Sequence, residues 1–409
     1  MKLLVLSSCY PRRHAPSHGL FIHRQIRSLQ ELGAECHVLQ PADWSPPAPL
    51  HKLYAGWQYG HDERSDMLDT VESVSVHHPR TWLPVPSRFF PGDYWTRVGH
   101  SVARYVKAHR ELHNADALYA HFLCHEGYAG LIASRELQIP LVAIARGDDV
   151  HLWPERWPDR KPKLAAVLRH AKGLLACSAG LARDAASWAT DGLSCPIEVV
   201  YNGIETALFT PAPDSDAKLA VRRQFNLPET ARLLLCIATP IVEKGWLDLL
   251  DALAALNLPD WHIVMAGAPR ATDDLNLADE AARRGLTGRA HWLGLVNAAA
   301  IPALYQAVDA FALASYNEGL SNSVLEAMAS GLPVVATEVG GHAEIINDGN
   351  EGRLIPARDV KALTAALYEI LTNDKRAAGM GVTARQRALT VGTPRDNARH
   401  LLQYLEKIL

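Results

Sequence analysis

Long hydrophobic runs are the first feature that this 409-residue chain lacks. No apolar stretch approaches the roughly 20 residues that a membrane-spanning helix needs, and the apolar start Met1–Leu6 is too short for a signal peptide. Cysteine is also scarce: six are scattered along the chain without a CxxC pair, which favours buried free thiols in a reducing compartment. We therefore expect a cytoplasmic protein. A peripheral contact with the cytoplasmic face of the inner membrane remains an open alternative.

The chain has no excess of charge of one sign. It carries 41 Lys and Arg against 44 Asp and Glu, a formal net charge of −3, which gives no electrostatic case for binding nucleic acid. No apolar strand pattern is followed by GxGxxG, so a nicotinamide-dependent enzyme is not expected. His, Cys and carboxylate residues show no convincing metal-ligand spacing. We therefore predict no cofactor and no metal.

What the chain does have is a regular alternation of short apolar runs with amphipathic segments. This pattern predicts parallel α/β sheets, and the chain length predicts two domains of roughly 150–200 residues each. We expect two doubly wound, Rossmann-like domains over residues 1–200 and 201–390. The segments Val199–Ile204 and Pro211–Lys218 are interpreted as a hinge region. The expected strands are 3–7, 36–39, 117–120, 141–145, 174–178, 233–238, 262–266, 290–293, 310–314, 334–337 and 353–355, and the expected helices include 22–32, 245–256, 322–330, 360–372 and 395–408.

The most informative segment is Tyr316–Gly331, which follows the apolar run 310–314 and leads into a helix. Glu318 is expected in a loop beyond the carboxyl end of a strand, where open α/β sheets bind ligands. The N–H groups of residues 320–323 would open the helix and attract an anion. A carboxylate beside such a site suits a ligand that carries both phosphates and hydroxyls.

A structural interpretation of the same segment stays open. Ser323-Val324-Leu325-Glu326 has the pattern of a capping box, in which Glu326 would only reach back to the helix start. For Glu318, the separate alternative is an ordinary solvated loop acid in a turn that contains glycine.

Glu318 and Glu326, separated by seven residues, and the run from Ala327 to Ile346 resemble the donor-site signature of one family. This family is the retaining glycosyltransferases of family GT4, also called glycosyltransferase group 1, which have the GT-B fold. The resemblance covers nearly the full length and is strongest over residues 290–372. It implies two Rossmann-like domains facing a cleft between them, with the C-terminal helix 391–409 completing the N-terminal domain.

Other segments match the family in order along the chain. The segment from Pro11 to Gly19 resembles the glycine loop near the donor diphosphate, and Asn202-Gly203-Ile204 resembles the interdomain turn. The resemblance implies that His121 contacts the donor sugar, Glu318 holds its hydroxyls, and Lys244 neutralises the diphosphate. These three are the expected catalytic residues, and the expected donor-binding residues are Gly19, Arg146, Thr239, Gly319, Leu320, Ser321, Asn322 and Glu326.

Two departures from the family pattern concern positive charge. Thr239 stands where the family usually has an arginine that shares the phosphate contact. Arg146, in Arg146-Gly147-Asp148-Asp149, stands where relatives often have histidine. We hypothesise that Arg146 partly restores the missing cation. The alternative is that Arg146 pairs with Asp148 or Asp149 and only shapes its loop.

Asp214-Ser215-Asp216 has the DxD spacing with which GT-A glycosyltransferases hold a metal. It lies in a connector rich in Pro and Asp rather than after a core strand, and we interpret it as a solvated loop. The segment Pro79–Trp95, rich in Pro and aromatic residues, is either a packed connection or a loop that contacts the acceptor or a membrane.

The resemblance implies transfer of a hexose-type sugar from a nucleotide donor, UDP in preference to GDP, with retention of configuration. The implied acceptor is a glycan or a lipid-linked molecule in bacterial surface polysaccharide biosynthesis, of exopolysaccharide or lipopolysaccharide type. Two alternatives remain: a GT-B nucleotide-sugar epimerase, and a catalytically weak protein that binds a nucleotide sugar.

Overall fold

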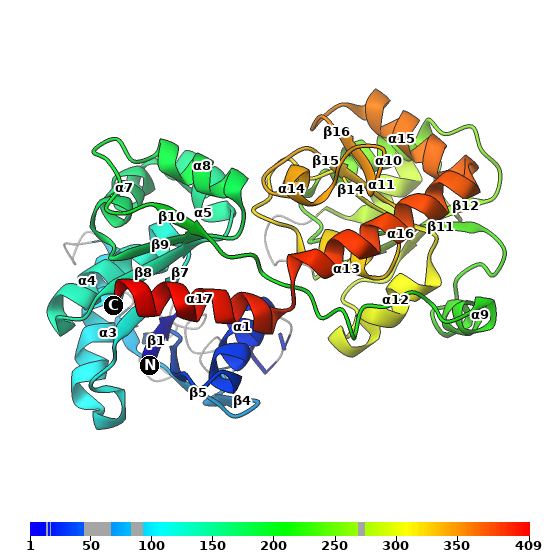
Figure 1. The fold of residues 1–409 in the computed structure, drawn as a ribbon. Coiled ribbons are helices and arrows are strands. Elements are labelled where there is room, and N and C mark those ends of the chain that lie inside the picture. Colours follow the sequence, from blue (N-terminus) through cyan, green and yellow to red (C-terminus); the bar gives the residue numbers. More distant parts are fainter. Residues whose placement is uncertain (14, 17, 45–66, 83–92, 269–274) are drawn as a thin grey trace, which may run out of the picture. The chain divides into compact units, whose positions relative to one another are not determined.

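The computed structural model describes residues 1–409 except 14, 17, 45–66, 83–92 and 269–274. The chain forms two compact units, one of Met1–Asn202 with Pro394–Leu409 and one of Gly203–Thr393 (Figure 1). The sequence placed the two boundaries after residues 200 and 390. Among the described residues, no helix combines the length and the apolar character needed to cross a membrane.

The sheet of the first unit has the strand order β10-β9-β8-β7-β1-β2-β5-β4, and its pairs are parallel except β4 with β5. The order runs in opposite directions from β1 and β7, so the topological switch point lies between these two strands. Their bounds are β1 Lys2–Leu6, β2 Glu35–Leu39, β4 Thr70–Val71, β5 Val74–His77, β7 Ala117–His121, β8 Leu141–Ala145, β9 Gly173–Ala176 and β10 Ile197–Val199. A separate parallel pair joins β3 (Ala42–Trp44) to β6 (Arg80–Trp82).

The helices of the first unit cover this sheet, and the last of them comes from the end of the chain. The core of the unit includes Ala398, Leu401 and Leu405 of α17, which pack with residues of β1 and α1. Figure 1 shows both chain termini in this unit. The helices are α1 Leu20–Glu31, α3 Tyr94–Ala108, η3 Arg110–Leu112, the π-helix η4 Leu123–Gly127, α4 Tyr128–Leu137, α5 Asp148–His151, α6 Trp153–Arg156, η5 Pro158–Arg160, α7 Lys161–His170, α8 Ala179–Ser187 and α17 Pro394–Ile408.

The sheet of the second unit is parallel, with the order β13-β12-β11-β14-β15-β16, and its switch point lies between β11 and β14. Its strands are β11 Arg232–Ile237, β12 Trp261–Ala266, β13 Ala290–Trp292, β14 Ala310–Leu313, β15 Val334–Thr337 and β16 Gly352–Ile355. Its helices are α9 Ser215–Gln224, η6 Val242–Lys244, α10 Trp246–Ala254, α11 Leu277–Arg283, η7 Ala298–Ala300, α12 Ile301–Ala307, α13 Asn322–Ala329, α14 His342–Ile345, α15 Val360–Thr372 and α16 Asp374–Val391.

Two local predictions are wrong. The segment Pro211–Lys218 is not only a hinge, because helix α9 begins within it. The Asp214 carboxylate accepts a hydrogen bond from Ala217 N at 2.8 Å and caps this helix. The DxD-like sequence is therefore a helix start rather than a loop, and the preference of aspartate for the N-cap position explains it. Of the segment Pro79–Trp95, residues 83–92 lie outside the described part of the chain, and its two proposed roles stay predictions.

Candidate functional site

The second unit brings Lys244 and Glu318 together at the carboxyl edge of its sheet. Lys244 ends η6, which follows β11, and Glu318 lies in the loop after β14. Since β11 and β14 are neighbours on either side of the switch point, this is the position where doubly wound sheets bind ligands. The Lys244 Nζ atom lies 2.8 Å from Glu318 Oε1, and Ser315 Oγ donates a hydrogen bond to the same oxygen at 2.8 Å.

The Glu318 carboxylate is held in its charged form. Its side chain is 11% exposed and that of Lys244 is 22% exposed. Burial raises the pKa of Glu318, but the charge of Lys244 and the hydrogen bonds from Lys244 and Ser315 outweigh burial and leave the pKa lowered. An anionic Glu318 beside a cationic Lys244 offers hydrogen-bond acceptors for hydroxyls next to a positive charge for phosphates. The alternative of a merely solvated loop acid is therefore wrong.

Gly245 fixes the direction in which Lys244 leaves the sheet. Its φ is +67°, a conformation that side chains with a Cβ rarely adopt, and a Cβ there would lie 1.8 Å from the Ala314 carbonyl oxygen. The loops are also joined by a hydrogen bond from Tyr316 N to Glu243 O at 2.8 Å. The close backbone contact between the two loops therefore requires glycine.

His342 is a polar residue near this cluster that the sequence analysis did not single out. It is fully buried, and its Nδ1 lies 2.8 Å from Thr337 O, which makes Nδ1 the donor. Its Nε2 is buried without a hydrogen-bond partner among the described residues. Burial lowers the pKa of His342, and the charge of Glu318 opposes that shift. The only signal in the sequence was its place within the family-like run Ala327–Ile346.

The turn before α13 contains the other residues expected near the donor. Ser321 is the N-cap: its Oγ accepts from Val324 N at 3.5 Å and lies 3.1 Å from Ser323 Oγ. Gly319 O accepts a hydrogen bond from Gly341 N at 2.8 Å, and Leu320 is buried. Asn322 is the first residue of the helix.

The alternative of a capping box is wrong, because the N-cap is Ser321 rather than Ser323. Glu326 therefore lies two residues beyond the position from which a side chain reaches back to the cap. Instead, the Tyr305 hydroxyl donates a hydrogen bond to Glu326 Oε2 at 3.0 Å. A function of Glu326 beyond that bond stays a prediction.

Thr239 lies in the loop after β11 and supports this loop through its backbone. Its carbonyl oxygen accepts hydrogen bonds from Trp246 Nε1 and Ile241 N, both at 2.8 Å. A role of Thr239 in binding the donor stays a prediction.

In the first unit, His121 and Arg146 lie at the carboxyl ends of two neighbouring strands. His121 ends β7, and Arg146 directly follows β8. The Arg146 guanidinium donates to Asn202 Oδ1 at 2.6 Å, to Gln25 Oε1 at 3.0 Å and toward His121 Nδ1 at 3.0 Å. His121 is fully buried, and burial followed by the charge of Arg146 holds its pKa well below the ordinary value.

The carboxylate of Asp149 organises the loop that carries Arg146. Its oxygens accept hydrogen bonds from the backbone N atoms of Leu123 at 2.6 Å, Arg146 at 3.0 Å and Gly147 at 2.9 Å. Asp149 is thus joined to the Arg146 backbone, while the guanidinium bonds run to Asn202, Gln25 and His121. The alternative of a side-chain pair with an adjacent aspartate does not describe this loop.

Gly19 is the N-cap residue of α1, in the connection that follows β1. Its φ is +67°, and a Cβ would lie 2.2 Å from the Cys9 carbonyl oxygen. Glycine is therefore needed at this position because the backbone of Cys9, in the same connection, approaches it closely. Ser8 N in the same connection donates to Glu126 Oε1 at 3.0 Å. Glu126 is buried in the π-helix that follows His121, and burial raises its pKa to about 7. Sequence reasoning missed Glu126, because nothing local marks it as buried.

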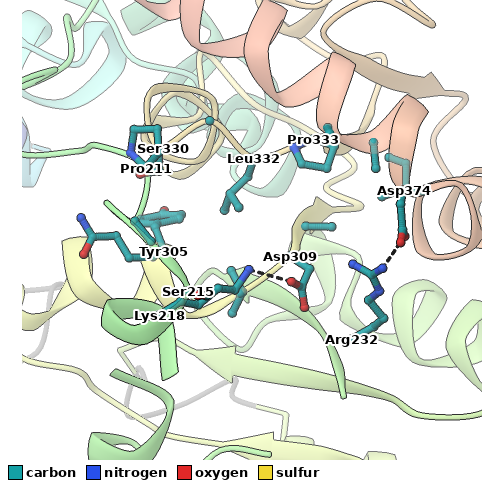
Figure 2. A pocket seen from close by; sticks show the side chains of 18 of the residues that line it. Pro211, Ser215, Lys218, Arg232, Tyr305, Asp309, Ser330, Leu332, Pro333 and Asp374 are labelled. Atoms are coloured by element: carbon teal, nitrogen blue, oxygen red, sulfur yellow. Dashed lines mark hydrogen bonds and ion pairs between the residues drawn. The ribbon is translucent and has the colours of Figure 1, made fainter. Parts of the chain in front are cut away.

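A cavity of about 360 Å³ in the second unit lies at the other edge of its sheet (Figure 2). Arg232 and Ala310 on its wall start strands β11 and β14, and Pro333 precedes β15. Figure 2 shows Lys218 paired with Asp309 and Arg232 paired with Asp374. This cavity is therefore separate from the loops of Lys244 and Glu318, which follow the carboxyl ends of the strands.

Among the described residues, no group of three or more His, Cys, Asp or Glu is placed to hold a metal ion. Independence from metal remains a prediction.

Two family models match this chain, one over most of each unit. The model described as "Glycosyltransferase Family 4" matches residues 19–208, and the model described as "Glycosyl transferases group 1" matches residues 218–387. The chain belongs to the family 4 (group 1) glycosyltransferases. The two matched ranges cover the loops of both units described above, and the predicted family is confirmed.

Two bacterial proteins illustrate the relatives of this glycosyltransferase. TuaC of Bacillus subtilis (strain 168), named for teichuronic acid biosynthesis, is 28% identical over 90% of this chain and 88% of its own. LpsB of Rhizobium meliloti (strain 1021), a lipopolysaccharide core biosynthesis mannosyltransferase, is 30% identical over 53% of this chain and 62% of its own.

Solved structures support the predicted GT-B fold. The Anabaena protein HepE in complex with UDP and glucose has a TM-score of 0.73 at 20% identity, covering 100% of both chains. Sucrose-phosphate synthase from Thermosynechococcus elongatus has a TM-score of 0.80 at 18% identity, covering 100% of this chain and 99% of that one. The expected architecture, two Rossmann-like α/β domains, is therefore confirmed.

Proposed function

We propose that this glycosyltransferase moves a hexose from a nucleoside diphosphate donor, UDP in preference to GDP, to a glycan or lipid-linked acceptor. The transfer retains the anomeric configuration and needs no metal. We place it in bacterial surface polysaccharide biosynthesis, with a peripheral contact to the inner membrane where a lipid-linked acceptor is held. TuaC and LpsB, both named for cell-surface glycans, support this setting.

The observation that carries the proposal is the cluster of Lys244, Ser315 and Glu318 beside the switch point of the second sheet. Lys244 would offset the negative charge that develops on the departing diphosphate. Glu318 would accept hydrogen bonds from hydroxyls of the donor sugar, and Glu326 from those of the ribose. The N–H groups at the start of α13 would contribute further donors to the phosphates.

The residues of the first unit complete the proposed chemistry. His121, neutral because of its lowered pKa, would donate a hydrogen bond to the sugar rather than transfer a proton. We propose that the acceptor hydroxyl attacks from the face on which the diphosphate departs, and that the leaving phosphate takes its proton.

A panel of UDP- and GDP-sugars tests the donor by thermal shift in the presence of EDTA. A donor at 100 times its Kd should stabilise the protein by about 2.7 kcal/mol. Turnover is then measured with glycan and lipid-linked acceptors, and the anomeric configuration of the product is read by NMR. Stabilisation by GDP-sugars alone would contradict the UDP assignment. A changed nucleotide sugar without any acceptor would indicate an epimerase, and no response to any nucleotide would contradict the whole proposal.

A further inference from the structure

The hydrogen bond between Arg146 and His121 determines where the histidine carries its proton. A guanidinium has only donors, so the Nδ1 atom 3.0 Å from Arg146 must be the acceptor. The neutral ring then carries its hydrogen on Nε2. The lowered pKa of His121 agrees with this assignment, because a protonated ring would place a second cation against Arg146.

The Nε2–H group that results has no partner in the described part of the chain. Nε2 of His121 is buried and makes no hydrogen bond there. A buried donor without an acceptor costs roughly 1–3 kcal/mol, and such groups require an explanation such as a bound ligand. A sugar hydroxyl oxygen would accept from it.

Arg146 is itself held in place by residues from distant parts of the first unit. Gln25 Oε1 accepts from the guanidinium at 3.0 Å and also from the Tyr119 hydroxyl at 3.2 Å. Asn202, the last residue of the unit before the chain enters the second unit, accepts at 2.6 Å. The guanidinium carbon lies 5.2 Å from the centre of the Phe21 ring. These contacts orient the planar fork toward His121.

We propose that Arg146 is a positioning residue that fixes His121 as its Nε2–H tautomer, so that His121 presents one oriented donor to the sugar. This inference rests on the proposed function, and it differs from the hypothesis that Arg146 binds the donor phosphates. It assigns the arginine to its three neutral acceptors rather than to the ligand. The orientation of His121 toward the sugar during transfer would then depend on a residue that never touches the donor.

The test uses the full-length protein with Arg146→Met, which removes the charge, and Arg146→Lys, which keeps the charge but not the planar fork. Arg169→Met is the matched control, because Arg169 pairs with Asp191 at an exposed position. Long-range ¹H–¹⁵N NMR at neutral pH reports the His121 tautomer, with His121→Gln used to assign its signals. Steady-state kinetics and donor titration give kcat and Kd for each variant.

Wild type and Arg169→Met should show the Nε2–H tautomer, and Arg146→Met should show a mixture with Nδ1–H. Arg146→Lys, whose ammonium also has only donors, should keep part of the Nε2–H preference. The kcat of Arg146→Met should fall by roughly 10- to 100-fold, the loss that follows removal of the partner that orients a metal-binding histidine, while the donor Kd changes about 3-fold or less. An unchanged tautomer in Arg146→Met would overturn the proposal, and so would a large loss of donor affinity with the tautomer intact, which would indicate phosphate binding.

If the Met variant does not fold, Arg146→Gln replaces it, because the Gln amide can also accept from Nδ1–H and therefore does not fix the tautomer. The NMR result does not depend on turnover. A wild-type protein that shows the predicted tautomer but transfers no sugar would therefore contradict the proposed function and leave the positioning role of Arg146 standing.

Discussion

At the scale of single residues, the two glutamates of the donor-site motif have different surroundings. Glu318 Oε1 accepts from Lys244 and Ser315, whereas Glu326 Oε2 accepts from the buried Tyr305 hydroxyl. Glu318→Gln removes the negative charge but keeps the shape, and Glu326→Gln does the same at the other position. The pair of variants therefore separates their roles without altering the packing.

We expect Glu318→Gln to lower kcat by on the order of 100-fold or more, because it weakens contacts that orient the sugar during transfer. Glu326→Gln should instead weaken nucleotide binding, by roughly 10-fold for one charged hydrogen bond. Kinetics and calorimetric titration with UDP distinguish the two effects. Equal losses in melting temperature with activity preserved in both variants would support a purely structural role.

Glu126 gives a prediction for pH dependence. In the unfolded chain its carboxyl has an ordinary pKa of 4.5, and burial raises the folded value to about 7. Because the folded state holds the proton more tightly, stability from this group is complete below about pH 4.5 and is lost as pH rises toward 7. The loss is at most about 3 kcal/mol.

Glu126→Gln mimics the protonated form at every pH and keeps an acceptor for Ser8 N. The stability of this variant relative to wild type should therefore increase between pH 5 and pH 7.5 and stay constant above that. Urea unfolding across this range measures the difference, in which the other titrating groups cancel. A constant difference across the range would show that Glu126 is ionised in the folded protein.

At the scale of elements, the position of η6 depends on one glycine. Gly245 and Gly285 have nearly the same positive φ, +67° and +72°, but their surroundings differ: a Cβ at Gly245 would lie 1.8 Å from Ala314 O, while a Cβ at Gly285 would have nothing within 4 Å. Gly285→Ala should cost about 1–2 kcal/mol from its backbone conformation alone. Gly245→Ala should cost roughly 1–3 kcal/mol more through the clash.

Gly245→Ala should also weaken UDP binding, since Lys244 would be displaced with the loop. Chemical unfolding and UDP titration of both variants check this, with Gly285→Ala as the matched control. Equal destabilisation of the two variants would mean that the β14 loop moves away freely.

The sequence predicted the elements whose side chains are apolar on every face or on one clear stripe. Strands Leu141–Ala145 and Val334–Thr337 and helix Val360–Thr372 have the predicted bounds, because buried parallel strands and amphipathic helices show their burial directly. Helix α16 was not predicted, since much of its buried face consists of small residues such as Gly381, Ala384 and Ala388. A stripe of small residues gives only a weak apolar pattern.

The same reasoning explains what could be predicted of the site. Lys244 and Glu318 follow apolar strands, so their meeting at one sheet edge follows from strand order. The partners of Arg146 could not be predicted, because Gln25 lies 121 positions away in the sequence and no local pattern pairs them. His342 and Glu126 are distinguished by their burial. The sequence around a polar residue does not show whether that residue is buried, so neither could be predicted.

At the scale of the whole molecule, the chain leaves the first unit after Asn202 and returns to it at Pro394. The returning helix α17 contributes Ala398, Leu401 and Leu405 to the core that contains β1 and α1. Since β1 leads into the connection that carries Gly19, the end of the chain supports the strand from which this connection starts. Before the structure, only family resemblance indicated this return of the chain.

This arrangement predicts that a substitution near the C-terminus destabilises the N-terminal unit. Leu401 is fully buried, so Leu401→Ala should lower the free energy of unfolding by about 2–5 kcal/mol. Leu409 is 44% exposed, so Leu409→Ala should change the free energy of unfolding by no more than about 0.5 kcal/mol. Hydrogen exchange read by mass spectrometry should show faster exchange in β1 and β2 of Leu401→Ala, with β11 and β14 unchanged. Faster exchange in the strands of the second unit instead would mean that α17 stabilises that unit, which would contradict the prediction.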